Sequence, residues 1–114
     1  MHEYGLTLGL IEAASKHANG ARVTKIALVI GEASDVLGDS IRLCFDLIAE
    51  GTPCYGAAIE IETTKPMLRC NSCGGLFERK PFSFDCPCGG EGGPTEIGRE
   101  YYIKYIEVEP CQSE

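Results

Sequence analysis

Residues 70–90 read CNSCGGLFERKPFSFDCPCGG, and the spacing of their cysteines predicts how this part of the chain folds. Four of these residues are cysteines, namely Cys70, Cys73, Cys86 and Cys88. The segment around them, residues 65–98, is rich in glycine and poor in aliphatic side chains. It cannot bury enough apolar surface to fold unaided, so we expect a bound metal to hold it together. We call residues 65–98 the cysteine lobe.

The cysteine spacing favours one tetrahedral zinc ion. The C-x2-C pair of Cys70 and Cys73 puts two thiolates on one turn, and Cys86 with Cys88 completes the shell. A Gly-Gly pair follows each half, which permits the positive φ that a chain needs where it doubles back around a metal. Four thiolates leave no open position for water, so we expect a structural Zn²⁺ rather than a catalytic one.

The second half of the motif departs from the usual form. Zinc ribbons commonly read C-P-x-C-G at this point, whereas Cys86-Pro87-Cys88-Gly89 is one residue shorter. Thiolates two residues apart still reach one ion, so the local geometry changes more than the ligation does. Iron in a rubredoxin-like arrangement takes the same ligands and is an alternative, as are reduced thiols or a different ligand in place of Cys88.

Composition narrows the class of protein. The chain has 114 residues and a hydrophobic share of 44%, which argue for a folded domain. Its net charge of −7 argues against a protein that binds nucleic acids or anionic membranes, because such a protein needs a basic face. No apolar run reaches the roughly 18 residues of a membrane span, and the first residues lack the features of a signal peptide. We therefore expect a cytoplasmic protein, in which reduced cysteines serve as metal ligands. Three further cysteines are scattered: Cys44, expected in the core, and Cys54 and Cys111, whose roles stay open.

The segments on either side of the lobe predict an α+β fold. Periodicity indicates helices over residues 4–18 and 39–50, and strands over 23–30, 57–63 and 100–109. The predicted architecture is two helices packed on a small mixed sheet, with a zinc-ribbon lobe inserted before the last strand. The corresponding domains are residues 1–64 plus 99–114, and residues 65–98.

Details of these elements can be tested against a structure. The first helix is expected to place one stripe inward, formed by Leu6, Leu10, Ala13, Ala14 and His17. The second is expected to have Asp39 or Ser40 as its N-cap. Its inward stripe is Ile41, Cys44, Phe45 and Ile48. In the last strand the apolar parity changes between Ile103 and Ile106, which predicts a bulge or twist.

The chain begins Met1-His2-Glu3, which brings several potential metal donors together. A methionine before a large residue is normally retained, so we expect a free α-amine on Met1. That amine, the His2 backbone nitrogen and the His2 imidazole form adjacent chelate rings, and Glu3 can supply a fourth position. A planar, nitrogen-rich set of this kind suits Ni²⁺ or Cu²⁺. A solvated His2 without a metal is the alternative.

An amino-terminal Met1-His2-Glu3 combined with a cysteine ribbon at residues 70–88 resembles the HypA family of hydrogenase maturation factors. The likeness extends over nearly the whole chain. It includes the Ile-Gly that ends the strand near residue 31, the Glu50-Gly51-Thr52 turn and the Gly98-Arg99-Glu100 segment that leads into the last strand.

The resemblance implies a nickel metallochaperone. An enzyme is disfavoured by the residues themselves, because both histidines have other expected roles and no Ser-His-Asp or paired-carboxylate arrangement is evident. His2 would be the principal side-chain ligand for Ni²⁺ as cargo, with Met1 contributing its amine and Glu3 a ligand or an orienting group. The four lobe cysteines match the family's structural Zn²⁺ ligands. The implied partners are the GTPase HypB and the large subunit of [NiFe]-hydrogenase. Urease maturation proteins as further partners, and a monomer or a homodimer as the oligomeric state, are left open.

Two other classes of function compete with this hypothesis. The first is a zinc-ribbon module for nucleic acids or proteins, since Arg69, Arg79 and Lys80 flank the cysteines. The second is a redox protein that uses Cys70 and Cys73 as a dithiol or binds iron. DNA or RNA binding would favour the first, and colour or disulfide turnover the second.

Overall fold

The computed structural model describes residues 2–80 and 82–110, and for His2 only the backbone. Its elements run in the order α1 (His2–Ala18), β1 (Val23–Gly31), α2 (Gly38–Ile48), β2 (Ala58–Thr64), β3 (Met67–Cys70), β4 (Leu76–Glu78), β5 (Gly92–Pro94) and β6 (Tyr101–Val108). Met1 and Cys111 lie outside the described residues. None of the helices in the described ranges is long and apolar enough to cross a membrane.

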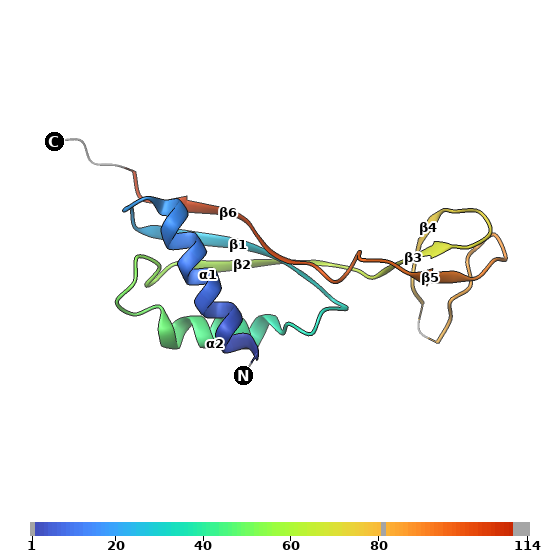
Figure 1. Cartoon of the computed structure of the whole chain (residues 1–114), viewed down its shortest axis with the longest axis horizontal. Coiled ribbons are helices and arrows are strands. Elements are labelled where there is room, and N and C mark those ends of the chain that lie inside the picture. Colours follow the sequence, from blue (N-terminus) through green and yellow to red (C-terminus); the bar gives the residue numbers. More distant parts are fainter. Residues whose placement is uncertain (1, 81, 111–114) are drawn as a thin grey trace.

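The strands form two separate sheets. In the first, with order β2-β1-β6, β1 pairs parallel with β2 and antiparallel with β6. The second, with order β4-β3-β5, is antiparallel and lies between β2 and β6 in the chain. Figure 1 shows the second sheet at one end of an elongated molecule whose extents are 64 × 32 × 16 Å. The expected α+β fold with a lobe inserted before the last strand is confirmed.

The apolar core lies between both helices and one face of the first sheet. Buried side chains of α1, β1, α2 and the turn after α2 form it: Leu10, Ile11, Ala14, Ala18, Val23, Ile26, Leu28, Ile30, Ile41, Phe45, Ala49 and Cys54. The predicted stripe of α2 is confirmed for Ile41 and Phe45, while Cys44 and Ile48 are half-buried. The alternating side chains Ile26, Leu28 and Ile30 of β1 thus face the helices.

Two predictions about the helices are wrong. The N-cap of α2 is Leu37, which makes no side-chain cap hydrogen bond. The next residue is Gly38, where a Cβ would lie 3.1 Å from the Ile61 side chain on β2, so the helix starts close to this strand. The buried face of α1 includes Thr7 and Ile11, and His17 lies outside this face and is exposed. Thr7 is satisfied in this position because its hydroxyl donates to the Glu3 carbonyl at 2.6 Å.

The irregularity predicted in the last strand is present. Ala27 pairs with Tyr105 and the next residue, Leu28, pairs with Ile103, so Lys104 is an extra residue on β6. This bulge lets Ile103 and Ile106 both pack against the core although they are three residues apart.

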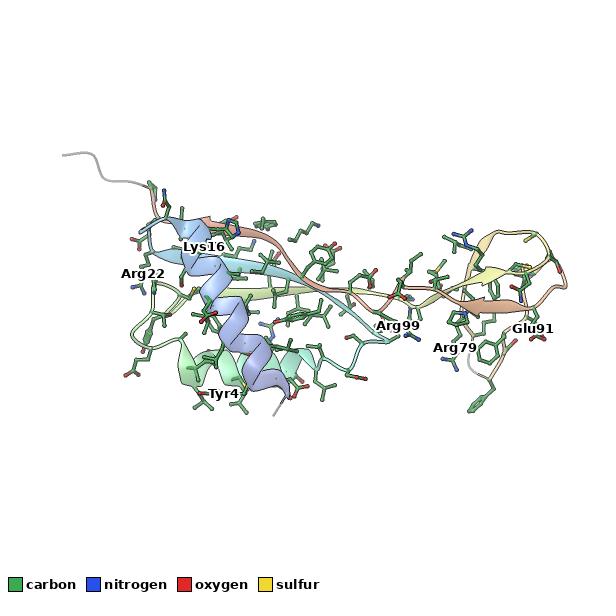
Figure 2. All side chains as sticks on the ribbon, in the orientation of Figure 1. Tyr4, Lys16, Arg22, Arg79, Glu91 and Arg99 are labelled. Atoms are coloured by element: carbon green, nitrogen blue, oxygen red, sulfur yellow. The ribbon has the colours of Figure 1, made fainter. Side chains whose placement is uncertain are left out.

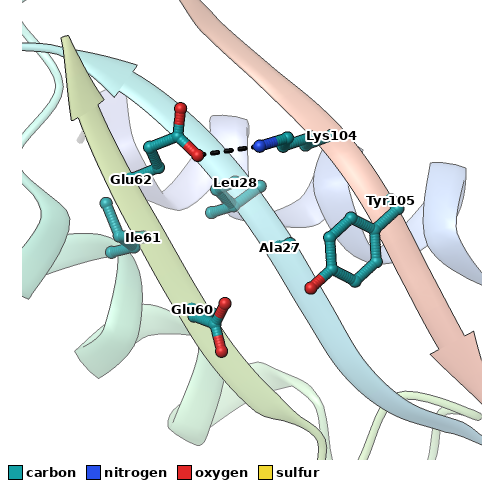
Figure 3. Close-up of a pocket in the computed structure, with 7 residues that line it drawn as sticks. All are labelled: Ala27, Leu28, Glu60, Ile61, Glu62, Lys104 and Tyr105. Atoms are coloured by element: carbon teal, nitrogen blue, oxygen red, sulfur yellow. Dashed lines mark hydrogen bonds and ion pairs between the residues drawn. The ribbon is translucent and has the colours of Figure 1, made fainter.

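The other face of the first sheet carries no helix in the described part of the chain. Ala27 and Val29 point toward it, yet they are only 5% and 1% exposed. Long side chains from the outer strands cover them: Lys104 pairs with Glu62 at 2.9 Å across β1. Figure 3 shows this pair and Tyr105 around Ala27, enclosing a depression of about 100 Å³. The aliphatic parts of the Lys104 and Glu62 side chains thus cover the apolar surface of Ala27 and Val29.

Two glycines form a close crossing where the cysteine lobe joins the first sheet. A Cβ on Gly31 would lie 2.0 Å from the Gly98 carbonyl oxygen, and a Cβ on Gly98 would lie 2.6 Å from Pro66. Gly98 also has a φ of 98°, which side chains other than glycine rarely adopt. Hydrogen bonds tie the same segments together, with the Ala33 N–H donating to the Gly98 carbonyl at 2.7 Å.

Glu100 secures this crossing with its carboxylate. The Thr64 hydroxyl and the Gly98 N–H donate to the same Glu100 oxygen at 2.6 and 2.8 Å. The hydrogen bond from Thr64, followed by those from backbone N–H groups, lowers the pKa of the Glu100 carboxyl below its ordinary value. Glu100 therefore stays ionised at neutral pH and holds β2 and β6 together at the base of the lobe.

Gly31→Ala is expected to destabilise the protein by about 3 kcal/mol, because the new methyl group meets rigid backbone rather than a movable side chain. Gly9→Ala is the matched control: nothing lies within 4 Å of its Cβ position in α1, so it is expected to stabilise by about 0.5–1 kcal/mol. Urea unfolding at a fixed zinc concentration measures both. Equal stabilities for Gly31→Ala and the wild type would contradict the tight crossing.

Candidate metal centres

Two similar turns bring the four lobe cysteines together. β3 ends at Cys70, whose carbonyl accepts from the Gly74 N–H at 3.0 Å. The Cys86 carbonyl likewise accepts from the Gly89 N–H at 2.9 Å. Gly74 and Gly89 have φ values of 73° and 94°, as their positions after each cysteine pair predict. Each turn thus presents its two thiols toward the other turn.

The distances between the sulfurs fit a tetrahedral ion. The four Sγ atoms all lie within 4.8 Å of one another. Cys70 and Cys88 are 3.5 Å apart, and Cys73 and Cys86 are 3.8 Å apart. Tetrahedral zinc with a Zn–S bond of about 2.3 Å places its sulfurs about 3.8 Å apart. The shortened half of the motif therefore still delivers both of its thiols, although their role as zinc ligands stays a prediction.

Backbone N–H groups point at the sulfurs of the first turn. The N–H groups of Ser72 and Cys73 lie 3.3 and 3.4 Å from the Cys70 Sγ. These hydrogen bonds, that of Cys73 first, lower the pKa of Cys70 to about 6. At Cys86 the Cys88 N–H acts in the same direction, but burial and the neighbouring thiols raise the pKa to about 12. A metal bound by all four sulfurs would hold them as thiolates, because the thiolate is the form that ligates a metal.

The glycine at position 90 shows how closely the lobe packs around these thiols. A Cβ there would lie 2.8 Å from the Cys70 Sγ and 2.7 Å from the Ser72 Oγ. Cys70 and Cys86 are buried, whereas Cys73 and Cys88 are exposed. The cluster is therefore enclosed on one side by backbone and open to water on the other. Four converging sulfurs with no neighbouring base suit a structural metal better than hydrolytic chemistry.

The amino-terminal candidate site lies on a different part of the molecule. Met1 and the His2 side chain fall outside the described residues, and Glu3 is half-buried in the first turn of α1. The Tyr101 hydroxyl donates to the Leu6 carbonyl at 3.3 Å and fastens this end of α1 to β6. Figure 2 shows Tyr4 far from Glu91, which neighbours the cysteine turns. The structure therefore does not bring the two predicted sites together.

One buried thiol was not foreseen. Cys54 is 0% exposed, and its Sγ lies 3.6 Å from the Ser15 Oγ on α1. Burial raises the pKa of this thiol, so it is the opposite of a reactive cysteine. The sequence left the role of Cys54 open, because nothing in its local sequence showed that the turn packs on α1. Within residues 2–80 and 82–110, the lobe cysteines are the only group of three or more possible ligands close enough to share an ion.

The basic residues beside the cysteines have partners within the lobe. Arg69 donates to the Gly74 carbonyl at 2.7 Å, which supports the first cysteine turn. The Arg79 guanidinium lies 5.0 Å from the centre of the Phe84 ring. These contacts give two of the three cations a role inside the fold, which does not favour a phosphate-binding surface.

Comparison with known proteins places these features in a family. Residues 1–108 match the family described as hydrogenase/urease nickel incorporation, metallochaperone, hypA. The hydrogenase maturation factor HypA of Nostoc punctiforme is 40% identical over 110 residues, which cover 96% of both chains. That of Caldanaerobacter subterraneus subsp. tengcongensis is 38% identical, covering 96% of this chain and 100% of its own. A solution structure of HypA protein has a TM-score of 0.73 at 25% identity, covering 96% of this chain and 97% of that one.

Proposed function

The chain belongs to the HypA family of nickel metallochaperones, and from this premise we propose that it binds one Ni²⁺ at its amino terminus and delivers it to the large subunit of [NiFe]-hydrogenase. The family is one of metallochaperones rather than enzymes, and the membership expected from the Met1-His2-Glu3 and cysteine motifs is confirmed. The observation that carries the proposal is the match of residues 1–108, which spans both the amino terminus and the cysteine lobe.

The proposed nickel ligands are the Met1 amine, the His2 amide nitrogen and imidazole, and Glu3. Because α1 begins at His2, the amide groups here belong to the first turn, whose N–H groups have no partner within the helix. The His2 nitrogen is therefore free to bind a metal. The positive end of the helix dipole opposes a bound cation, and the acidic Glu3 in this turn offsets that effect. Such a site binds metal and can also release it.

The two metals have different proposed roles. Zn²⁺ held by Cys70, Cys73, Cys86 and Cys88 would be scaffold, because the short strands β3, β4 and β5 have little core of their own and depend on the ligands that join them. Ni²⁺ would be cargo, because a site at a chain end with few strong donors exchanges readily with a better ligand set. The proposed domains follow the same distinction, with zinc in residues 65–98 and nickel in the domain of residues 1–64 plus 99–114.

We propose specific partners and a location for this chain. Maturation of hydrogenase or urease is the family's task, and we propose HypB as the GTPase that works with this chain and the [NiFe]-hydrogenase large subunit as the recipient. Urease maturation proteins are a second possible recipient group. We propose that the protein acts in the cytoplasm, as a monomer or a homodimer.

A transfer assay tests the proposed function. Chain loaded with one Ni²⁺ and freed of excess metal would be mixed with purified nickel-free hydrogenase large subunit and HypB. Because the amino-terminal site has few donors, we expect nickel to move to the large subunit while zinc stays with the chain. The measurement is the metal content of each protein after separation. The division into cargo and scaffold would be contradicted if nickel stayed on the chain, or if zinc left the chain together with nickel.

A further inference from the structure

The first two turns of α1 are held less firmly than the rest of the helix. The side chains that α1 gives to the buried core all lie at or after position 10: Leu10, Ile11, Ala14 and Ala18. Of the described side chains in residues 3–9, only Thr7 is buried, and it is polar. In Figure 1 this end of the helix extends past the three strands of the first sheet, which the later turns cross. We call residues 2–9 the amino-terminal arm.

Two glycines weaken the helix within this arm. Gly5 and Gly9 lie one turn apart on exposed positions, and no atom outside the helix lies within 4 Å of the Cβ position at either one. Neither glycine has a positive φ. Packing and backbone geometry therefore give no reason for glycine here, although each glycine lowers the helix equilibrium constant about fourfold relative to alanine. The arm thus opens about fifteenfold more often than it would with alanine at both positions.

Two hydrogen bonds oppose this opening. The Tyr101 hydroxyl on β6 donates to the Leu6 carbonyl at 3.3 Å, and the half-buried Leu6 side chain packs against the core beside it. Burial raises the pKa of Tyr101, so this hydroxyl keeps its proton at neutral pH. Within the arm, the Thr7 hydroxyl donates to the Glu3 carbonyl at 2.6 Å. Tyr101 therefore fastens the arm to the sheet, and Thr7 keeps Glu3 in the helical turn.

We propose that the amino-terminal arm unwinds as one unit when nickel is released, and that Tyr101 is the positioning residue that keeps it closed. The inference rests on the proposed function, which places the nickel donors at Met1, His2 and Glu3. A chelated ion leaves its donors one at a time, and a donor that is fixed in a helix stays beside the ion and rebinds. Unwinding lets a detached donor move away. It also lengthens the arm from about 12 Å to at most about 26 Å, which brings the cargo toward a recipient.

Hydrogen exchange on the zinc-loaded, nickel-free chain tests the arm itself. The N–H groups of residues 6–9 bond to carbonyls within the arm, so their exchange reports its opening. After correction for intrinsic rates, we expect them to exchange at least about a hundredfold faster than the N–H groups of residues 14–18. The double variant Gly5→Ala with Gly9→Ala should slow the exchange of residues 6–9 about fifteenfold. Tyr101→Phe should speed it about fivefold, because it removes one hydrogen bond.

The rate of nickel transfer from the loaded chain to excess EDTA tests the consequence for the cargo. We expect the double alanine variant to slow this transfer about fifteenfold and Tyr101→Phe to speed it about fivefold, with one zinc retained by each. Tyr102→Phe is the matched control, because Tyr102 is the neighbouring tyrosine on β6 and is 51% exposed. It should change neither the exchange of the arm nor the release of nickel.

The outcomes separate the arm from the proposed function. If residues 6–9 exchanged at the rate of residues 14–18, there would be no separate arm, and nickel as cargo would be unaffected. If nickel release stayed the same in both the double alanine variant and Tyr101→Phe, the role of Tyr101 would be structural only and the proposal would be overturned. A chain that loaded no nickel would contradict the proposed function, and the role of the arm in nickel release with it.

Discussion

His2→Ala is expected to abolish stoichiometric nickel binding and to leave one zinc per chain. The substitution removes the imidazole and with it one chelate ring of the proposed site. Loss of an outer-shell partner alone costs a metal site roughly 10–100-fold in affinity, so loss of a direct ligand should exceed roughly 100-fold. The fold should not change, since the helix that starts at His2 is held by the packing of Leu10, Ile11 and Ala14.

Elemental mass spectrometry on tag-free protein that begins with its own Met1 measures this effect. Samples would be taken as purified and after Ni²⁺ loading and desalting. His17→Ala is the matched control, because His17 is an exposed histidine at the other end of the same helix. The wild type and His17→Ala should bind one nickel. Nickel retained equally by His2→Ala would move the cargo site elsewhere.

The same site should lose nickel as the pH falls. An imidazole has a reference pKa of ~6.5 and an α-amine one of ~7.7–8.0, and both must be unprotonated to bind metal. Protons therefore compete for the proposed donors below neutrality. In the proposed zinc site four thiolates would form a closed coordination shell, so nickel should leave at a higher pH than zinc does.

Cys73→Ser is expected to release zinc and to unfold the cysteine lobe while the β2-β1-β6 sheet persists. Zinc binding to small structural sites contributes about 10–16 kcal/mol of apparent folding free energy, and this lobe has almost no core to replace it. Its buried residues include Leu68, Cys70 and Cys86, of which two are themselves predicted ligands. The core of the first sheet and the helices has its own cluster of buried side chains, none of which comes from the lobe.

Zinc content and limited proteolysis would measure the loss. Cleavage should appear within residues 65–98 of Cys73→Ser and be absent from the wild type. Cys44→Ser is the matched control, because Cys44 is a half-buried cysteine on α2 that lies away from the lobe. If Cys73→Ser kept its zinc and its melting temperature, the assignment of the four cysteines would be wrong.

Patterns that one element carries by itself were predictable from the sequence. The apolar spacing of α2 indicated Ile41 and Phe45, and both are buried. The parity change in the last strand indicated the bulge at Lys104, because a strand that buries Ile103 and Ile106 on one face must gain a residue between them. The cysteine spacing indicated that two distant pairs converge, and their sulfurs do.

Features that depend on two distant segments were not predictable. The rotation of α1 that exposes His17 follows from its packing on α2 and β1, and the helix alone has no feature that reveals it. The close approach of Gly31 to Gly98 is invisible in either segment by itself. Strands β3, β4 and β5 are too short for an alternating pattern to show, since each has three or four residues. The Cys54 thiol is buried by a turn that packs against α1.

The insertion of the lobe between β2 and β6 also sets an order of events during folding. The helices, β1 and β2 precede the lobe in the chain, so they leave the ribosome before β6 does. Until β6 arrives, β1 has an open edge, which is a site for aggregation. The entropic cost of closing a loop grows with its length, and a lobe closed on the proposed zinc ion would bring Glu100 back to Thr64 as if the loop were short. We therefore expect zinc supplied during synthesis to shorten the time for which the nascent sheet stays exposed, even though none of the proposed zinc ligands belongs to that sheet.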